Sequence, residues 1–317
     1  MSANNTNGFR VDDTQGHYEE VKIPVPWGHI AGKWWGSKDQ QPVLAIHGWQ
    51  DNAGTFDNLA PHLVKANLSV LCLDMPGHGY SSHYPPGLFY YIFWDGVHVL
   101  RRVVKHYKWS SVKLLGHSMG GAISFLYAAF YPEEVDCYVA LDIASPAVRD
   151  SNKMYNVTAG AVDRFLKYEG FDSGTAPTYR YKQMLEIVVE GYEGSVTEES
   201  CHVLMRRGTR SDNECCDQYT FTRDPRLKLC ALGTMDINQA VDLARRVKCR
   251  VMNVRAVHSH THSDPGYYDK VLDVVEKNAR VLVRVNVDGT HHVHLNNAER
   301  VAGHVVDFLL DEDDDLI

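Results

Sequence analysis

The sequence lacks any apolar run approaching the about 18 residues of a membrane-spanning helix, and its polar start, residues 1–13, lacks the apolar centre of a secretory signal. It also lacks lysine- or arginine-rich runs. The formal net charge is −8, and the longest charged block is the acidic DEDDD at 311–315. Nucleic-acid binding requires a basic surface. We therefore expect a cytoplasmic protein with no nucleic-acid partner and no integral membrane segment.

CxxC motifs are absent, and the seven cysteines are scattered apart from the neighbours Cys215 and Cys216. This pattern favours reduced thiols over a disulfide framework. The segment HSHTH places His258, His260 and His262 at alternate positions, which suits zinc on an extended segment. No carboxylate or cysteine follows at a matched spacing. We therefore predict a solvated histidine-rich loop, no metal site and no organic cofactor.

An alternation of short apolar runs and helical patterns is present instead. Six runs that are mostly apolar on both faces predict buried strands, at 42–48, 68–74, 111–116, 137–142, 249–254 and 280–287. Apolar residues recur with helical spacing at 94–107, 119–131 and 267–278. Such alternation predicts an α/β fold with a mostly parallel, doubly wound sheet. The hairpin-like stretch 18–36 is expected to add antiparallel strands at one edge.

One region, residues 145–248, interrupts this alternation with helical periodicity and few strand patterns. Its candidate helices are 159–170, 178–192, 195–207 and 237–247. Ser195 and Glu198 have the spacing of a capping box for the third helix. We predict a helical cap inserted between two parts of one core, 20–144 and 249–310, with polar tails at 1–19 and 311–317.

Ser118 stands in the pattern G-x-S-x-G, formed by Gly116, His117, Ser118, Met119 and Gly120. The pattern lies between an expected strand and an expected helix. A strand that turns directly into a helix holds its middle residue in a strained conformation and leaves no room for a Cβ two positions away. We therefore predict that Ser118 is a nucleophile, the alternative being a glycine-rich turn in which the serine caps the helix.

A serine nucleophile needs a histidine base, which in this architecture follows the last strand. Three histidines, His291, His292 and His294, follow the run 280–287. His291 is the first after the expected turn and is the predicted base. His292 stays open as the alternative, whereas His294 is expected to pack in the loop. His47 ends an earlier strand, before the serine, and is not expected to be the base.

The acid that would orient the histidine is the least defined residue. Asp142 ends the run 137–142, where a carboxylate can reach the histidine, and Asp264 follows the run 249–254 at an unusually long distance. We favour Asp142 and leave Asp264 open. The two expected oxyanion donors are the main-chain N–H groups of Met119, directly after the nucleophile, and Trp49, after the run 42–48.

Four segments now carry a family resemblance: HGWQDNAGTFD at 47–57, LDMPGHGYSSHY at 73–84, GHSMGG at 116–121 and HHVHLNNAERV at 291–301. They resemble the α/β-hydrolase superfamily and, more closely, the animal serine hydrolase-like proteins. The resemblance implies an α/β-hydrolase fold with an eight-stranded sheet, helices on both faces, and Ser118 and His291 as nucleophile and base. Thr290 departs from the expected pattern, since a glycine usually precedes the base. Some such relatives associate with vesicles or peroxisomes.

These observations predict a serine hydrolase that cleaves small acyl compounds, carboxylic esters or thioesters, through Ser118, His291 and Asp142 and an acyl-enzyme. A rival hypothesis is a non-catalytic or slow ligand-binding protein on the same fold, because a fold does not fix a function. A third is cleavage of a carbon–carbon bond by the same residues. The expected partner is a small-molecule acyl substrate, and the sequence leaves its identity and the oligomeric state open.

Overall fold

A computed structural model describes residues 17–90, 93–169, 176–211, 217–228, 234–260 and 262–311. An eight-stranded sheet forms its centre, in the order β1-β2-β4-β3-β5-β6-β11-β12. Its strands are Tyr18–Val25 (β1), Gly28–Trp35 (β2), Val43–Ile46 (β3), Val70–Leu73 (β4), Val112–His117 (β5), Val135–Leu141 (β6), Arg250–Ala256 (β11) and Val281–Val287 (β12).

The sheet is mostly parallel, which confirms the predicted architecture. β2 pairs antiparallel with both β1 and β4, and the remaining neighbours pair in parallel. All six predicted strands and the predicted hairpin are present. The tail predicted over 1–19 was too long, because β1 begins at Tyr18, whose main chain pairs opposite Trp35 and whose ring packs on it with 4.9 Å between ring centroids.

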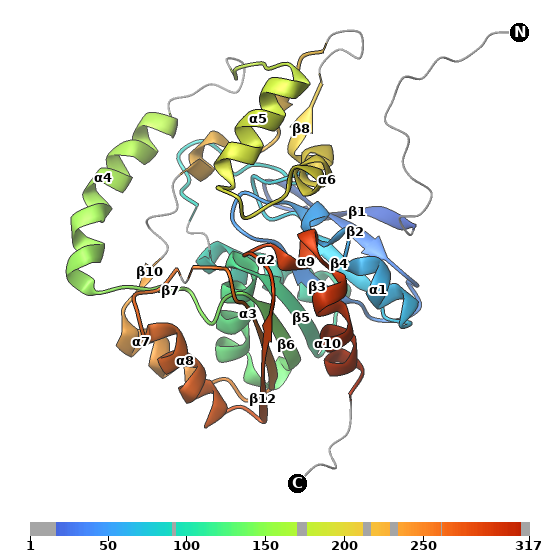
Figure 1. Ribbon diagram of the computed structural model, residues 1–317, viewed down its shortest axis with the longest axis vertical. Helices are drawn as coiled ribbons and strands as arrows, with labels where there is room; N and C mark the ends of the chain where they lie inside the picture. The colour runs from blue at the N-terminus through green and yellow to red at the C-terminus, as the bar shows by residue number, and fades with distance from the viewer. Residues whose placement is uncertain are drawn as a thin grey trace, which may run out of the picture.

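Helices cover both faces of the sheet, as predicted (Figure 1). The helices on one face are α2 (Phe93–Tyr107), α3 (Met119–Phe130), α7 (Ile237–Ala244) and α8 (Tyr267–Glu276), which share one apolar cluster with the strands. On the other face, α1 (Ala60–Lys65) and α10 (Glu299–Leu310) share a second cluster. A short helix, α9 (Val293–Asn296), precedes α10.

Of the described helices between β6 and β11, three do not cover a face of the sheet: two lie above its upper end and one lies to its left (Figure 1). They are α4 (Ser151–Glu169), α5 (Tyr181–Gly191) and α6 (Glu198–Gly208). Short strand pairs accompany them, β7 (Ala147–Val148) with β10 (Thr234–Met235), and β8 (Thr209–Arg210) with β9 (Thr220–Phe221). The capping box predicted from Ser195 and Glu198 was wrong. Thr197 caps α6 instead, by accepting a hydrogen bond from the Ser200 N–H group at 3.2 Å.

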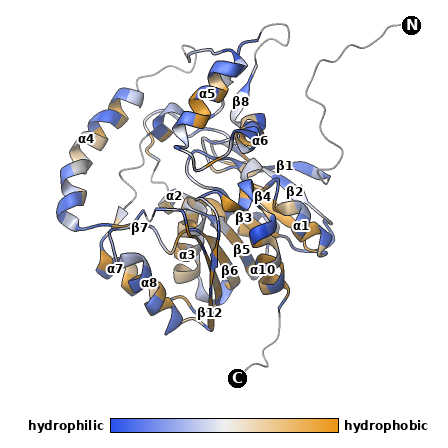
Figure 2. Ribbon diagram, viewed as in Figure 1, coloured by the Kyte–Doolittle hydropathy of each residue, from blue (hydrophilic) through white to orange (hydrophobic). Residues whose placement is uncertain are grey.

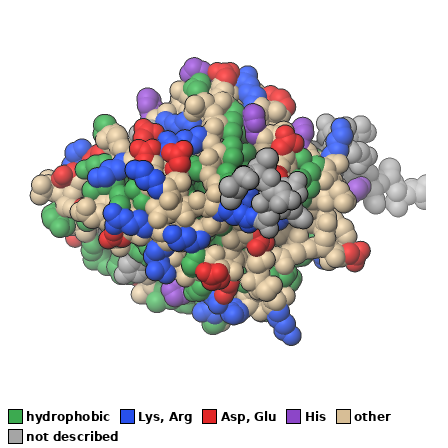
Figure 3. All heavy atoms as spheres, turned by 90° about the horizontal axis from the view of Figure 1, so that it is seen from below, with side chains coloured by type: hydrophobic (Ala, Val, Ile, Leu, Met, Phe, Trp, Pro, Cys, Tyr) green, Lys and Arg blue, Asp and Glu red, His purple; other side chains and the backbone are tan. Residues whose placement is uncertain are grey.

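The strands of the central sheet consist largely of apolar residues, whereas α4 has both polar and apolar residues along its length (Figure 2). The face opposite α5 and α6 carries basic and acidic side chains interspersed with apolar ones (Figure 3). None of the helices in the described residues is both long enough and apolar enough to cross a bilayer. The described cysteines, Cys72, Cys137, Cys201 and Cys249, are buried and free, while Cys215, Cys216 and Cys230 lie outside the described residues.

Candidate active site

The carboxyl ends of the parallel strands bring the candidate residues together at one edge of the sheet. Ser118 directly follows β5, and Asp142 directly follows β6. β12 ends at Val287, and the loop after it carries His291. Parallel strands with helical crossovers place their carboxyl ends, and therefore these loops, at the same edge. The sheet order β5-β6-β11-β12 sets Asp142 between the other two residues along that edge.

Ser118 occupies the sharp turn that the sequence pattern predicts. Its φ and ψ angles are 49° and −115°, a backbone conformation that residues other than glycine rarely adopt. The turn is held because the Ser118 N–H group donates to the Leu141 carbonyl at 3.1 Å, while the Ser118 carbonyl accepts from Ala122. Ser118 makes no side-chain cap on α3, which argues against a purely capping role.

Gly120 allows α3 to pass directly against β3. A Cβ on Gly120 would lie 1.9 Å from the Ile46 carbonyl oxygen, and backbone at that distance cannot move aside cheaply. We expect Gly120→Ala to lower the free energy of unfolding by more than about 3 kcal/mol, since overpacking against backbone exceeds the usual side-chain cost. Urea unfolding would measure it.

Gly303→Ala is the matched control, because nothing lies within 4 Å of a Cβ at this exposed position of α10. Alanine there should stabilise the chain by about 0.5–1 kcal/mol through its higher helix propensity. Equal effects of the two substitutions would contradict the close contact at Gly120.

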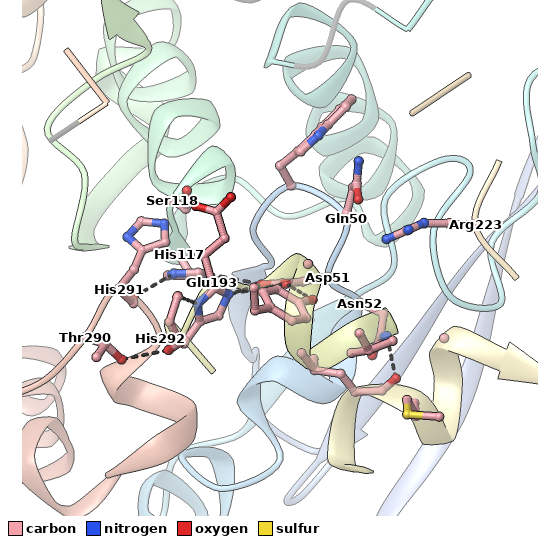
Figure 4. A pocket seen from close by; sticks show the side chains of 18 of the residues that line it. Gln50, Asp51, Asn52, His117, Ser118, Glu193, Arg223, Thr290, His291 and His292 are labelled. Atoms are coloured by element: carbon pink, nitrogen blue, oxygen red, sulfur yellow. Dashed lines mark hydrogen bonds and ion pairs between the residues drawn. The ribbon is translucent and has the colours of Figure 1, made fainter. Parts of the chain in front are cut away.

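His291 and Asp142 form a short hydrogen bond, with 2.6 Å between His291 Nδ1 and Asp142 Oδ2. The other oxygen, Asp142 Oδ1, accepts from the Ala256 N–H group at 2.9 Å and from Arg255 at 3.1 Å. Since Nδ1 donates to the carboxylate, the opposite nitrogen, Nε2, is left to accept a proton. Figure 4 shows the His291 ring turned towards Ser118 in the same wall of the cavity.

Asp264, the alternative acid, lies elsewhere. Its Oδ1 binds Lys153 Nζ at 2.9 Å, and its Oδ2 accepts from the Asp150 N–H group at 2.9 Å. Both partners lie at the start of α4, so Asp264 ties the loop after β11 to the cap. The structure therefore brings Asp142, and not Asp264, to His291.

Burial and charge act against each other at this pair. Burial is the largest influence on both groups: it lowers the pKa of His291 below its usual 6.5, although the hydrogen bond to Asp142 acts to raise it. For Asp142, burial acts to raise the pKa, but the hydrogen bond and charge of His291 outweigh it, so the pKa of this carboxyl is lowered. At neutral pH the pair is therefore a neutral imidazole beside a carboxylate.

The two expected oxyanion donors, Trp49 and Met119, lie next to the same site. Met119 is the first residue of α3, where a main-chain N–H has no partner within the helix. Trp49 follows β3 and lines the cavity. Among the described residues, neither main-chain N–H group donates a hydrogen bond within the chain. Both are thus available to an oxygen atom near Ser118.

Sequence reasoning missed a buried network beneath the site, centred on Asp51. Asp51 Oδ2 lies 3.3 Å from His117 Nδ1 and 3.2 Å from His292 Nε2. Tyr192 donates to Asp51 Oδ1 at 2.8 Å, and Ser195 Oγ lies 2.5 Å from His292 Nδ1. The network joins the cap to the loops after β3, β5 and β12. A signal was present, because Asp51 lies five residues past the end of a strand whose carboxyl end faces the site.

This network supports His291 from below. His117 Nε2 lies 3.0 Å from the His291 carbonyl oxygen, which can only accept, so His117 donates there. Burial lowers the pKa of His117, and it acts to raise the pKa of Asp51, but the neighbouring histidines His292 and His117 hold the Asp51 pKa well below its usual value. His292, the alternative base, is bound to Asp51 and Ser195.

Asp51, His117 and His292 could also hold a metal ion, since each offers a ligand atom and these atoms lie within 4.8 Å of one another. Two imidazoles and one carboxylate are a donor set that zinc accepts. His117 Nδ1 makes no well-oriented hydrogen bond among the described residues, although Asp51 Oδ2 lies 3.3 Å from it. The other ligand atoms are already joined by hydrogen bonds, so the network needs no ion to hold its shape.

Two other histidines are structural. His47 lies in the core, with Nδ1 2.6 Å from the Gly48 carbonyl oxygen and Nε2 accepting from the Met75 N–H group at 2.9 Å. His294 Nε2 lies 3.0 Å from Thr55 Oγ1, away from the cavity. Neither is placed to accept a proton from Ser118.

The histidine-rich loop differs in part from its prediction. His258 is exposed and binds Asp288 at 2.8 Å. His262, however, lies against the base, with 3.3 Å between His262 Nε2 and His291 Nε2. His262 remains an exposed residue, yet partial desolvation of its ring and the nearby His291 lower its pKa to about 4. His262 therefore faces His291 as a neutral ring and forms part of the wall of the site. A loop that was solvated throughout would not contribute a side chain to this wall.

A cavity of about 630 Å³ lies between the edge of the sheet and the helices α5 and α6. Ser118, His291, His292 and Trp49 line its floor, while residues of α5, α6 and β9 line its roof. Its size is typical of small-molecule sites. The arrangement thus places a strained serine, a neutral imidazole with a bound carboxylate, and free N–H donors around one cavity.

Comparisons with known proteins agree with this geometry. The alpha/beta hydrolase fold family matches residues 41–175. A probable serine hydrolase of Drosophila melanogaster is 47% identical over 292 residues, covering 92% of this chain and 88% of the fly protein. Serine hydrolase-like protein 2 of Homo sapiens is 32% identical over 306 residues, covering 93% and 95% of the two chains.

Among solved structures, a hypothetical protein of Pseudomonas aeruginosa PAO1 superposes with a TM-score of 0.78 at 29% identity, covering 92% of this chain and 99% of the bacterial one. The thioesterase domain from the curacin biosynthetic pathway superposes with a TM-score of 0.76 at 19% identity, covering 92% and 100%; this second likeness shows the fold. The predicted family is confirmed: the chain has the α/β-hydrolase fold and belongs to the serine hydrolase-like proteins.

Proposed function

We propose that the chain is a serine hydrolase that cleaves a carboxylic ester or thioester of a small acyl compound. The observation that carries the proposal is the 2.6 Å hydrogen bond between His291 Nδ1 and Asp142, beside a strained Ser118 in one cavity. A serine hydroxyl is a weak nucleophile, and a base oriented by a carboxylate is the arrangement that activates it.

The first half-reaction transfers the acyl group to the protein. Ser118 Oγ attacks the carbonyl carbon while its proton passes to His291 Nε2, and the carbonyl electron pair moves onto oxygen. The N–H groups of Met119 and Trp49 stabilise this oxyanion. When the intermediate collapses, the alkoxide or thiolate leaves and takes the proton from His291, so that an acyl-Ser118 ester remains.

Water completes the cycle in the second half-reaction. It gives a proton to His291 Nε2 as its oxygen attacks the acyl carbon, and Ser118 Oγ leaves with that proton, releasing a carboxylic acid. Asp142 keeps the proton on Nδ1 throughout and stabilises the imidazolium. No step of this scheme draws on a metal or an organic cofactor. The region 145–248 would act as the cap that shapes the substrate space.

A fluorophosphonate probe tests the proposal, because it reacts covalently with an activated serine. We expect labelling of the wild type, none of Ser118→Ala, and at least a tenfold slower reaction of His291→Ala, since a positioned base contributes at least that much. His258→Ala is the matched control, an exposed histidine of the same cavity that binds Asp288. It should label like the wild type.

The outcome also decides between catalysis and binding. If folded wild-type protein does not react with the probe, the hydrolase proposal is wrong, and a ligand-binding protein on the same fold becomes the better description. Folding would be checked by circular dichroism on each variant.

A further inference from the structure

Arg223 is a charged residue of the cavity that the proposed reaction does not use. It follows β9 in the cap and lines the same cavity as Ser118. Figure 4 shows its guanidinium group pointing into the cavity from the side of Gln50, while Ser118 and His291 lie on the other side. The two ends of the cavity therefore differ: one carries the reacting groups, and the other carries a positive charge.

No acid partner of Arg223 is found among the described residues. Its guanidinium group lies over the face of the Phe221 ring, with 4.9 Å between Arg223 Cζ and the ring centroid. Other arginines of the cap are neutralised by carboxylates: Arg207 binds Asp74 at 2.9 Å, and Arg226 binds Asp224 at 2.7 Å. Within the described part of the chain, Arg223 is thus a cation without a counter-charge.

Such a charge is costly unless a ligand supplies its partner, because a charged group that loses water needs compensation. Burial lowers the pKa of Arg223, and the weaker influence of Tyr192 does not offset it. The cavity also contains two carboxylates, but Asp51 is engaged by Tyr192 and His292. Glu193 is exposed, and Figure 4 shows its side chain on the side of Ser118, across the cavity from Arg223, so neither carboxylate compensates Arg223.

We propose that Arg223 binds a carboxylate of the substrate, so that the enzyme acts on acyl compounds bearing a second, ionised carboxyl group remote from the scissile carbonyl. The planar guanidinium presents paired N–H donors that match the two oxygens of a carboxylate. This inference rests on the proposed hydrolase function, which supplies the reacting end of the cavity. The substrate class is therefore half-esters or half-thioesters of dicarboxylic acids.

Two substrates with the same acyl chain and the same leaving group test the effect of the second charge. They are the 4-nitrophenyl hemiester of suberic acid and 4-nitrophenyl methyl suberate, in which a methyl group caps the second carboxylate. We expect the wild type to favour the hemiester by about 10- to 100-fold in kcat/KM, the range of a hydrogen bond to a charged group. The preference should lie mainly in KM, because Arg223 is remote from the reacting atoms.

Arg223→Met keeps an unbranched side chain and removes the charge. It should abolish the preference by slowing hemiester hydrolysis alone, while Arg223→Lys should retain part of it, since a lysine charge lacks the paired donors. Arg245→Gln is the matched control, because Arg245 is exposed on the surface and binds Asp242. Equal use of both esters by the wild type, or an equal loss on both in Arg223→Met, would overturn the inference.

A binding measurement separates this inference from the hydrolase proposal. Calorimetry of Ser118→Ala should show monomethyl suberate binding at least tenfold more tightly than dimethyl suberate, and Ser118→Ala/Arg223→Met should lose the difference. If the wild type hydrolyses neither ester yet this difference is present, the hydrolase proposal fails and the carboxylate site stands. If both esters are hydrolysed equally and no difference in binding is found, the carboxylate site fails and the hydrolase stands.

Discussion

Replacement of Asp142 by asparagine should reduce kcat by about 10⁴-fold, the effect of losing the carboxylate that fixes the histidine tautomer in a serine triad. Asparagine has nearly the same size, and its oxygen can still accept from the Ala256 N–H group, so the fold should persist. It cannot, however, stabilise the imidazolium that forms when Ser118 attacks. Hydrolysis of 4-nitrophenyl butyrate would measure the loss.

Asp264→Asn is the matched control for the same substitution at the other candidate acid. Asp264 binds Lys153 and the Asp150 N–H group at the start of α4 and makes no contact with His291. We expect kcat within about twofold of the wild type, the usual range of a surface substitution. A large loss in Asp264→Asn together with a small one in Asp142→Asn would reverse the assignment.

The pH profile gives a second readout of Asp142. The reaction needs neutral His291, and burial lowers the pKa of this histidine, so the acidic limb of kcat/KM should lie below pH 6.5. Asp142 acts to raise that pKa. In Asp142→Asn the residual activity should therefore persist to still lower pH. A merely structural role of Asp142 would leave the position of the limb unchanged.

The sheet and the nucleophile were predictable because both depend on local rules. A strand buried on both faces is mostly apolar, as at 68–74 and 111–116, and such runs can be recognised without knowing which strand pairs with which. The turn at Ser118 leaves no room for side chains at positions 116 and 120. The glycines at these two positions make the turn recognisable from the sequence. His291 followed from its position after the last strand.

The acid could not be settled from the sequence because its assignment depends on pairing between distant strands. Asp142 accepts from the Ala256 N–H group only because β6 and β11 are neighbours, across the whole inserted region. Asp264, judged by distance along the chain, was a reasonable rival. The Asp51 network had the same difficulty, since it joins three separate loops to the cap.

The cap was harder to predict for another reason. α4 buries few side chains, with Ala161 and Phe165 the buried apolar residues among those described in it, so its periodicity gives only a weak signal. Its observed start at Ser151 precedes the expected start at 159. Arg223 could not be recognised as a cavity residue until the cap was placed over the sheet.

Mild acid should destabilise this protein strongly, because four described histidines are buried as neutral rings. Burial lowers the pKa of His47, His78, His117 and His294. In the unfolded chain each histidine titrates near pH 6.5. Below that pH the unfolded state therefore binds more protons than the folded state, whose buried histidines stay neutral. Stability is thus fully present above pH 6.5 and falls as the pH decreases.

The free energy of unfolding should change steeply with pH. One such histidine contributes up to about 1.4 kcal/mol per pH unit, and four together up to about 5 kcal/mol per pH unit. Domains have about 5–15 kcal/mol of stability in total, so unfolding should follow within about one to three pH units. The lowered pKa of Asp51 acts in the same direction at lower pH, since its contribution is lost only as the pH falls through its folded value.

Urea unfolding between pH 7.5 and pH 5 would measure this slope, with His294→Leu as the informative variant. His294 Nδ1 has no partner among the described residues, and the ring does not line the cavity. The ring packs on His117 with 4.2 Å between ring centroids, and its Nε2 lies 3.0 Å from Thr55 Oγ1, so leucine removes the titrating group together with that hydrogen bond while keeping an apolar side chain against His117. The slope should decrease by about 1.4 kcal/mol per pH unit. His304→Gln, at an exposed position of α10, should leave it unchanged. A flat profile in the wild type, or an unchanged slope in His294→Leu, would show that these rings take up protons in the folded state as readily as in the unfolded chain.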